Sequence, residues 1–154
     1  LPAKEVRSDS QFMLNAFYRS MGLKQLLIAN LELLASSGRN FKEVLFELAK
    51  INLELKNFDE AEQYYLQLLQ SDELFTDALS DLSFIYYQKQ QFLKSLAFSQ
   101  RAINSAPNNL DILFNHCLVL LSLDQKQEAA SLIDTILTVN PNYQKAKNLK
   151  KQLQ

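Results

Sequence analysis

The 154-residue chain has the length of one ordinary domain, and an apolar content of 47% is enough to bury a hydrophobic core. Its net charge of −1 gives no strong field for nucleic acid or an anionic membrane, and one cysteine with one histidine excludes a disulfide framework and the usual zinc clusters. Only two glycines and three prolines are present, which predicts an all-α chain with short connections.

The N-terminal part of the chain has a weak helical pattern. We interpret residues 1–8, which have mixed charge and contain Pro2, as a tail. The helical period begins at Asp9, breaks at Met21-Gly22 and resumes to Ser36, so residues 9–41 resemble a degenerate helix hairpin. No apolar run here approaches the roughly 18 residues that cross a bilayer. Because the chain opens on leucine, we expect an excerpt or a processed product.

The clearest pattern covers residues 76–109. Two halves of helical period are separated by Gln90-Gln91 and closed by Pro107, since proline cannot continue a helix. A shift of 34 residues finds the same pattern on both sides of it, which gives units 42–75, 76–109 and 110–143. Helix hairpins that recur at this spacing predict a stacked array.

Several residues predict where helices begin and end. Asn57, followed three residues later by Glu60, resembles a capping box at the start of a helix, and Asn109 is expected to cap the next unit. Residues 144–154 are rich in lysine and glutamine and carry only a sparse apolar stripe. A terminal repeat must present a polar outer face, so we expect this segment to be a C-terminal capping helix.

Residues 42–143 resemble tetratricopeptide repeats, a family of 34-residue helix hairpins. The family places small residues at positions 8 and 20, where the two helices cross, and large side chains there would force the helices apart. The turn glycine of the family is missing, which predicts non-glycine residues in the left-handed region. The small pairs are Ala49 with Ala61, Ser83 with Ser95 and Cys117 with Ala129, and the turn residues are Lys56, Gln90 and Asp124.

The resemblance implies a right-handed superhelical solenoid whose concave wall is lined by the first helix of each unit. Helical geometry places positions 5, 9 and 12 together, about 140° from the core-facing sector. These positions are largely apolar here, and a connected apolar surface on a monomer indicates an interaction site. The expected protein-binding groove consists of Phe12, Phe46, Lys50, Leu53, Phe84, Tyr87, Phe114, Leu118 and Leu121. The expected acidic edge beside it consists of Glu43, Glu47, Asp77, Asp81 and Asp111.

We therefore expect a non-catalytic scaffold that binds another protein, through an apolar peptide or an amphipathic helix with basic flanks. His116 and Cys117 are adjacent but occupy packing positions of the repeat, so we interpret them as core residues. No phosphate loop can be built from Gly22 and Gly38, and we expect no cofactor, metal, nucleic acid or membrane insertion.

Four alternatives stay open at this stage. The groove could be covered by the chain's own tail or by a second copy in a structural oligomer. The chain could be a bacterial type III secretion chaperone for translocator proteins, a group of similar length with three such repeats. It could also be a regulatory arm of a larger enzyme. The residues by which some family members grip chaperone tails are absent, and a lone cysteine is compatible with a reducing compartment such as the cytoplasm.

Overall fold

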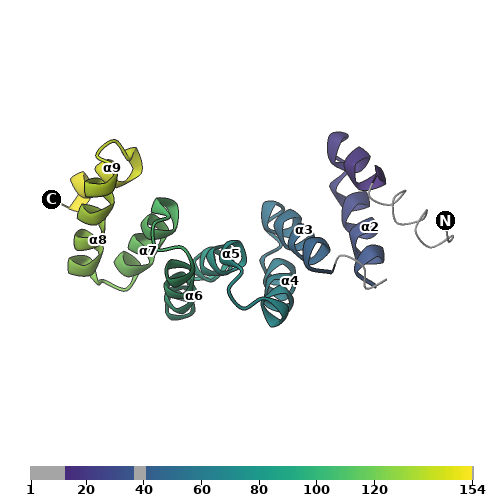
Figure 1. The fold of residues 1–154 in the computed structure, drawn as a ribbon, viewed down its shortest axis with the longest axis horizontal. Coiled ribbons are helices and arrows are strands. Elements are labelled where there is room, and N and C mark those ends of the chain that lie inside the picture. Colours follow the sequence, from purple (N-terminus) through teal and green to yellow (C-terminus); the bar gives the residue numbers. More distant parts are fainter. Residues whose placement is uncertain (1–12, 37–40, 154) are drawn as a thin grey trace. The chain divides into compact units, whose positions relative to one another are not determined.

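The computed structural model describes residues 13–36 and 41–153, which are helices joined by short turns (Figure 1). The chain divides into two compact units, residues 1–73 and 74–154, and each is described here by itself. In the first unit a helical segment over residues 13–20 precedes α2 (Lys24–Ser36), α3 (Phe41–Glu54) and α4 (Phe58–Ser71). The second unit consists of α5 (Thr76–Gln88), α6 (Phe92–Ser105), α7 (Leu110–Ser122), α8 (Lys126–Val139) and α9 (Gln144–Leu153). The described residues contain no strand, and the predicted all-α repeat solenoid is confirmed.

The hairpin turns repeat one backbone geometry. Lys56, Gln90 and Asp124 have φ angles of 61°, 58° and 59°, as the missing turn glycines predicted. In each turn the next residue donates to a carbonyl five residues earlier, for example Gln91 N to Tyr86 O at 2.8 Å, which closes the preceding helix by a Schellman-type bond. Gly22, with φ 68°, makes the same turn in the degenerate first hairpin.

The predicted small pairs lie where the two helices of each hairpin cross. Ala49, Ala61, Cys117 and Ala129 are fully buried, and Ser95 is as well. In the middle hairpin the Ser83 hydroxyl donates to the Ser95 carbonyl at 3.0 Å, and the Ser95 hydroxyl donates to the Ser83 carbonyl at 2.8 Å. The two helices can therefore approach closely, and both buried serine hydroxyls still have hydrogen-bond partners.

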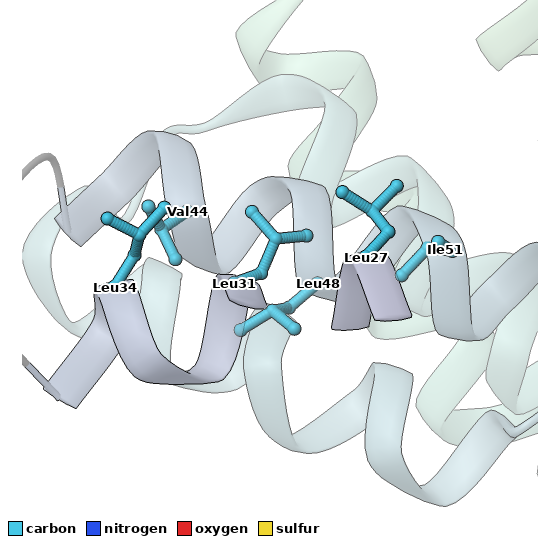
Figure 2. Close-up of a cluster of buried hydrophobic side chains, with 6 residues drawn as sticks. All are labelled: Leu27, Leu31, Leu34, Val44, Leu48 and Ile51. Atoms are coloured by element: carbon cyan, nitrogen blue, oxygen red, sulfur yellow. The ribbon is translucent and has the colours of Figure 1, made fainter. Parts of the chain in front are cut away.

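The core of the first unit is the contact between α2 and α3. Both helices present apolar residues at spacing i, i+4, i+7, and the two stripes face each other (Figure 2). The stripe on α2 is Leu27, Leu31 and Leu34, and the stripe on α3 is Val44, Leu48 and Ile51.

The core of the second unit joins α7, α8 and α9. Leu113 and Cys117 of α7 pack with Ile133 and Ile136 of α8, and Ala146 of α9 is fully buried in the same cluster. No helix of the described residues is both long and apolar enough to cross a membrane.

One of the two predicted asparagine caps is wrong. Asn109 caps α7, since its side-chain oxygen accepts from the backbone N–H groups of Asp111 and Ile112 at 3.1 and 3.3 Å. Asn57 precedes α4 but makes no side-chain cap bond. Its Nδ2 instead donates to the Asn52 Oδ1 at 3.2 Å, because the tight turn brings these two amides together.

Candidate functional site

The residues of the expected groove lie on the first helices of the hairpins, but they are distributed over both units. Phe46, Lys50 and Leu53 lie on α3 of the first unit. Phe84 and Tyr87 of α5 and the residues of α7 belong to the second unit. Phe12 lies outside the described residues. Each unit therefore has its own part of the surface, and a continuous groove stays a prediction.

In the first unit the predicted surface is strongly charged. The Phe46 ring packs against Tyr65 with centroids 6.3 Å apart, and the Lys50 ammonium lies over it at 5.5 Å. Beside Lys50, a pocket of about 270 Å³ is lined by Arg19, Lys24, Glu47 and Glu54 among others. Arg19 pairs with Glu47, and Lys24 pairs with Glu54 at 2.9 Å. Leu53 is half-buried, so α3 offers little free apolar area.

The second unit has an apolar pocket between α5 and α7. Phe84 and Tyr87 line it from α5, and Leu118 and Val119 line it from α7. The Phe84 side chain is 45% exposed, which is unusual for a phenylalanine in a packed helix. The pocket volume of about 170 Å³ is close to the ~150 Å³ of an engineered cavity that holds benzene. It is large enough for one apolar side chain and too small for most cofactors.

Two amide side chains at this pocket were not among the predicted groove residues. Gln88 of α5 and Asn115 of α7 also line it, and both are exposed. Their amides can donate to and accept from a polypeptide backbone. Asn115 holds position 6 and Gln88 holds position 13 of the repeat, whereas the predicted groove residues came from positions 5, 9 and 12 and position 6 was read only for its acidic residues. Tyr87 meets Phe92 edge to face at 5.7 Å, which holds one wall of the pocket in place.

The start of α9 covers part of the predicted surface on α7. The Tyr143 ring packs against Phe114 with centroids 5.9 Å apart, and Lys145 lies 6.0 Å from the Phe114 centroid. Asp111 accepts from the Tyr143 hydroxyl at 2.6 Å and pairs with Lys145 at 2.8 Å. These hydrogen bonds hold the pKa of Asp111 below its ordinary value. Asp111 and Lys145 are one repeat apart, and opposite charges at this spacing could have indicated the contact.

The acidic edge is only partly free. Glu43 and Asp77 are exposed, whereas Glu47 and Asp111 pair with cations of their own unit. Asp77, Asp81 and Phe84 share one face of α5, because their spacing of four and three residues follows the helical turn. The second unit therefore presents carboxylates next to its apolar pocket.

His116 and Cys117 are core residues, as predicted. The His116 ring is 6% exposed and its Nδ1 lies 2.7 Å from the Ser99 hydroxyl of α6. Burial lowers the pKa of His116 and raises the pKa of the Cys117 thiol to about 12, so at neutral pH the imidazole is uncharged and the thiol stays protonated. Among residues 13–36 and 41–153, no group of histidine, cysteine and acidic side chains could hold a metal ion.

Comparisons with known proteins agree with this architecture. A tetratricopeptide repeat family model matches residues 42–73, and no curated protein matches the chain by sequence. A MamA fragment from Desulfovibrio magneticus RS-1 that runs from its residue 41 to the end is similar in structure, with a TM-score of 0.86, 12% identity, and coverage of 94% of this chain and 82% of that fragment. YrrB, described as a TPR protein with an unusual peptide-binding site, has a TM-score of 0.80 and 14% identity, over 92% of this chain and 73% of YrrB.

A third structure is the first TPR domain of Spaghetti (RPAP3) bound to the HSP90 peptide SRMEEVD. It has a TM-score of 0.68 and 17% identity, over 73% of this chain and 89% of that domain. At these identities the three structures establish the fold alone. Residues 42–73 form a tetratricopeptide repeat, and the chain has the all-α repeat fold of tetratricopeptide repeat proteins.

Proposed function

We propose that this chain is a non-catalytic protein-interaction module and that the pocket between α5 and α7 binds an apolar side chain of a partner polypeptide. The observation that carries this proposal is the exposed Phe84 ring, which borders a pocket of side-chain size. The Phe84 ring is about half exposed at a concave site, so burying it under a partner side chain would lower the free energy of the complex.

The surroundings of the pocket suit an extended peptide or an amphipathic helix. Gln88 and Asn115 can hydrogen-bond to a peptide backbone, while Tyr87 and Leu118 provide rigid apolar walls. Asp81 lies one turn and Asp77 two turns before Phe84 on the same face of α5, so basic residues flanking the apolar anchor would be attracted. The peptide-binding descriptions of YrrB and of the Spaghetti domain support this reading of the fold.

The test is a selection of peptides from a random library displayed on phage, with the chain as bait, followed by titration of the selected peptides. We expect peptides with one aromatic or branched aliphatic anchor next to lysine or arginine. Phe84→Ser should weaken their binding about tenfold or more, because a central apolar contact is worth more than ~1.4 kcal/mol. The matched control is Leu93→Ser, since Leu93 on α6 is 75% exposed but does not line the pocket. Equal binding by both variants would contradict the proposal.

A further inference from the structure

Two charged pockets lie next to each other in the first unit, along the contact between α2 and α3. One, of about 270 Å³, has Leu27 and Ile51 in its wall, and the other, of about 280 Å³, has Leu31 and Val44. All four residues belong to the stripes that pack α2 against α3, so the two pockets follow one another along that contact (Figure 2). Both are separate from the pocket between α5 and α7, which belongs to the second unit.

The two pockets carry opposite excess charges. The pocket of about 270 Å³, named here the Lys50 pocket, is lined by three cations and two carboxylates, and the other, named the Asn15 pocket, by one cation and two carboxylates. The Arg19–Glu47 ion pair lines both pockets, and a second ion pair accounts for the remaining carboxylate of the Lys50 pocket. In the described residues this leaves two charges without an ion-pair partner, Lys50 in the first pocket and Glu43 in the second.

Asn15 gives its pocket a hydrogen-bond donor that no described neighbour uses. The later hairpins hold the smaller residues Ala49, Ser83 and Cys117 at this position. Asn15 is only 8% exposed, and its Oδ1 accepts from the Asn30 Nδ2 at 2.8 Å. The Nδ2 of Asn15 has no partner among the described residues, although most polar side-chain atoms of buried residues have one. A carbonyl oxygen of a ligand in the Asn15 pocket would supply that partner.

We propose that the two pockets together bind an extended segment of a partner protein in which a basic and an acidic side chain lie three residues apart. The basic side chain enters the Asn15 pocket and pairs with Glu43, and the acidic side chain enters the Lys50 pocket and pairs with Lys50. Charge complementarity favours this segment over a neutral or uniformly charged one. The site lies wholly in the first unit, so it is a second contact surface and does not depend on the α5–α7 pocket.

The distance between the two free charges sets the spacing in the partner. Glu43 and Lys50 are seven residues apart on α3, which is close to two turns, so they share one face of the helix about 10 Å apart. A polyproline II segment advances about 3.1 Å per residue and returns to the same side every third residue, so three residues cover this distance. The backbone carbonyls of such a segment are free to accept from the Asn15 Nδ2, whereas those inside a helix are already bonded.

The experiment is a selection of random 12-residue peptides displayed on phage, with the full chain carrying Phe84→Ser as bait. This replacement removes the anchor of the α5–α7 pocket, so the selection reports on other surfaces. The selected peptides are synthesised with acetylated and amidated ends, so that no terminal charge imitates a side chain. We expect lysine or arginine three residues from aspartate or glutamate. Binding should weaken about tenfold between about 50 mM and about 500 mM salt, because exposed charges are screened.

Reversal of one charge at a time tests each pocket. Lys50→Glu should weaken the binding of these peptides about tenfold or more and should itself select peptides with two basic residues, whereas Glu43→Lys should select peptides with two acidic residues. The matched control Lys151→Glu changes the net charge as Lys50→Glu does, on an exposed residue of α9, and should leave binding unchanged. Circular dichroism should show the same helix content in all variants, because the replaced side chains are exposed.

Three results would overturn the inference. The first is a selection that yields no peptides with the expected pair of charges, which would leave the proposed function intact because the bait lacks Phe84. The second is an equal loss of binding in Lys50→Glu and Lys151→Glu, which would indicate an effect of net charge alone. The third is binding that becomes at least tenfold tighter when the charged residues of the N-terminal segment are replaced by serine, because that segment would then be the occupant. These residues are Lys4, Glu5, Arg7 and Asp9.

Discussion

The imidazole of His116 and the hydroxyl of Ser99 connect α7 to α6, with Nδ1 and Oγ 2.7 Å apart. The Ser99 hydroxyl also lies 2.9 Å from the Leu96 carbonyl and donates its single proton there, so His116 donates to Ser99 through Nδ1–H. Burial lowers the pKa of His116, and the nearby Glu128 opposes this with a smaller effect. His116 is therefore a neutral hydrogen-bond donor in the folded chain at neutral pH.

This burial makes folding dependent on pH in a defined direction. The unfolded chain titrates its histidine near pH 6.5, whereas the folded chain does so at lower pH, so the unfolded state binds more protons between the two pKa values. The free energy of unfolding should therefore fall as the pH is lowered from about 7.5 to about 5. His116 is the one histidine of the sequence, so His116→Leu should remove this part of the dependence.

Urea denaturation of both proteins at several pH values measures this effect. Leucine should fit at position 116, because Leu48 and Leu82 occupy the equivalent positions in the other repeats, and Ser99 keeps its bond to Leu96. The free energies of unfolding of the two proteins should differ by no more than about 1 kcal/mol at pH 7.5, and the two curves should converge or cross as the pH falls. Parallel curves over the whole range would show that His116 does not cause the dependence.

The repeat spacing predicted the hairpins of residues 42–143 and their turns. Local chemistry is sufficient to predict these hairpins. Pro107 ends a helix, and Gln90 adopts the left-handed conformation at a turn where the family has glycine. Small residues are needed where the two helices cross, at Ser83 and Ser95. Each of these constraints acts within one hairpin, so it can be inferred from the order of residues alone.

Contacts between hairpins were harder to predict. The sequence assigned Phe114 to a free wall, but Tyr143 lies against it, because the entry of α9 depends on the orientation of the preceding turn. Leu14 and Leu48 are one repeat apart and hold the same position, yet the first is 38% exposed and the second is fully buried. An apolar pattern indicates which side of a helix avoids water, whereas its burial depends on which neighbour is present.

The left-handed turn residues offer a direct test of backbone strain. Gln90 has φ 58°, which costs a residue with a Cβ roughly 1 kcal/mol. Gln90→Gly should therefore raise the free energy of unfolding by up to about 1 kcal/mol. The adjacent Gln91 has φ −90°, where glycine gives no relief, so Gln91→Gly should lower the stability by about 0.5 kcal/mol. Thermal unfolding measures both, and a change of the same sign in both variants would contradict the strain argument.

The contact of Tyr143 with Asp111 should hold α9 in place. Tyr143→Phe keeps the ring against Phe114 but removes the 2.6 Å hydrogen bond to the Asp111 carboxylate. Because the pair is exposed, the loss should be modest, about 0.5 to 1 kcal/mol, and confined to α9. Amide hydrogen exchange should become faster in α9 and stay unchanged in α5 and α6. Faster exchange throughout the second unit would indicate a more general role.

The same contact predicts an acid dependence. The hydrogen bonds from Lys145 and Tyr143 lower the pKa of Asp111, so its contribution to stability is present above the unfolded value of ~3.9 and is lost as the pH falls through the folded value. Asp111→Asn should therefore lower the free energy of unfolding at pH 7. Below about pH 4, the free energy of unfolding of this variant should fall less steeply than that of the wild-type chain. Urea titrations at pH 7 and at about pH 3 measure the difference, and an equal acid loss in both proteins would assign it to other carboxylates.

The crossing of α5 and α6 should tolerate the loss of a hydroxyl far better than the addition of volume. Ser95 is fully buried and donates to the Ser83 carbonyl at 2.8 Å. Ser95→Ala removes this bond but leaves the close approach intact, as Ala61 and Ala129 do at the equivalent positions, and should cost about 1 kcal/mol. Ser95→Leu must push the helices apart and should cost about 3 kcal/mol or more. If urea denaturation gave equal losses for the two variants, the hydrogen bond rather than the close packing would limit this position.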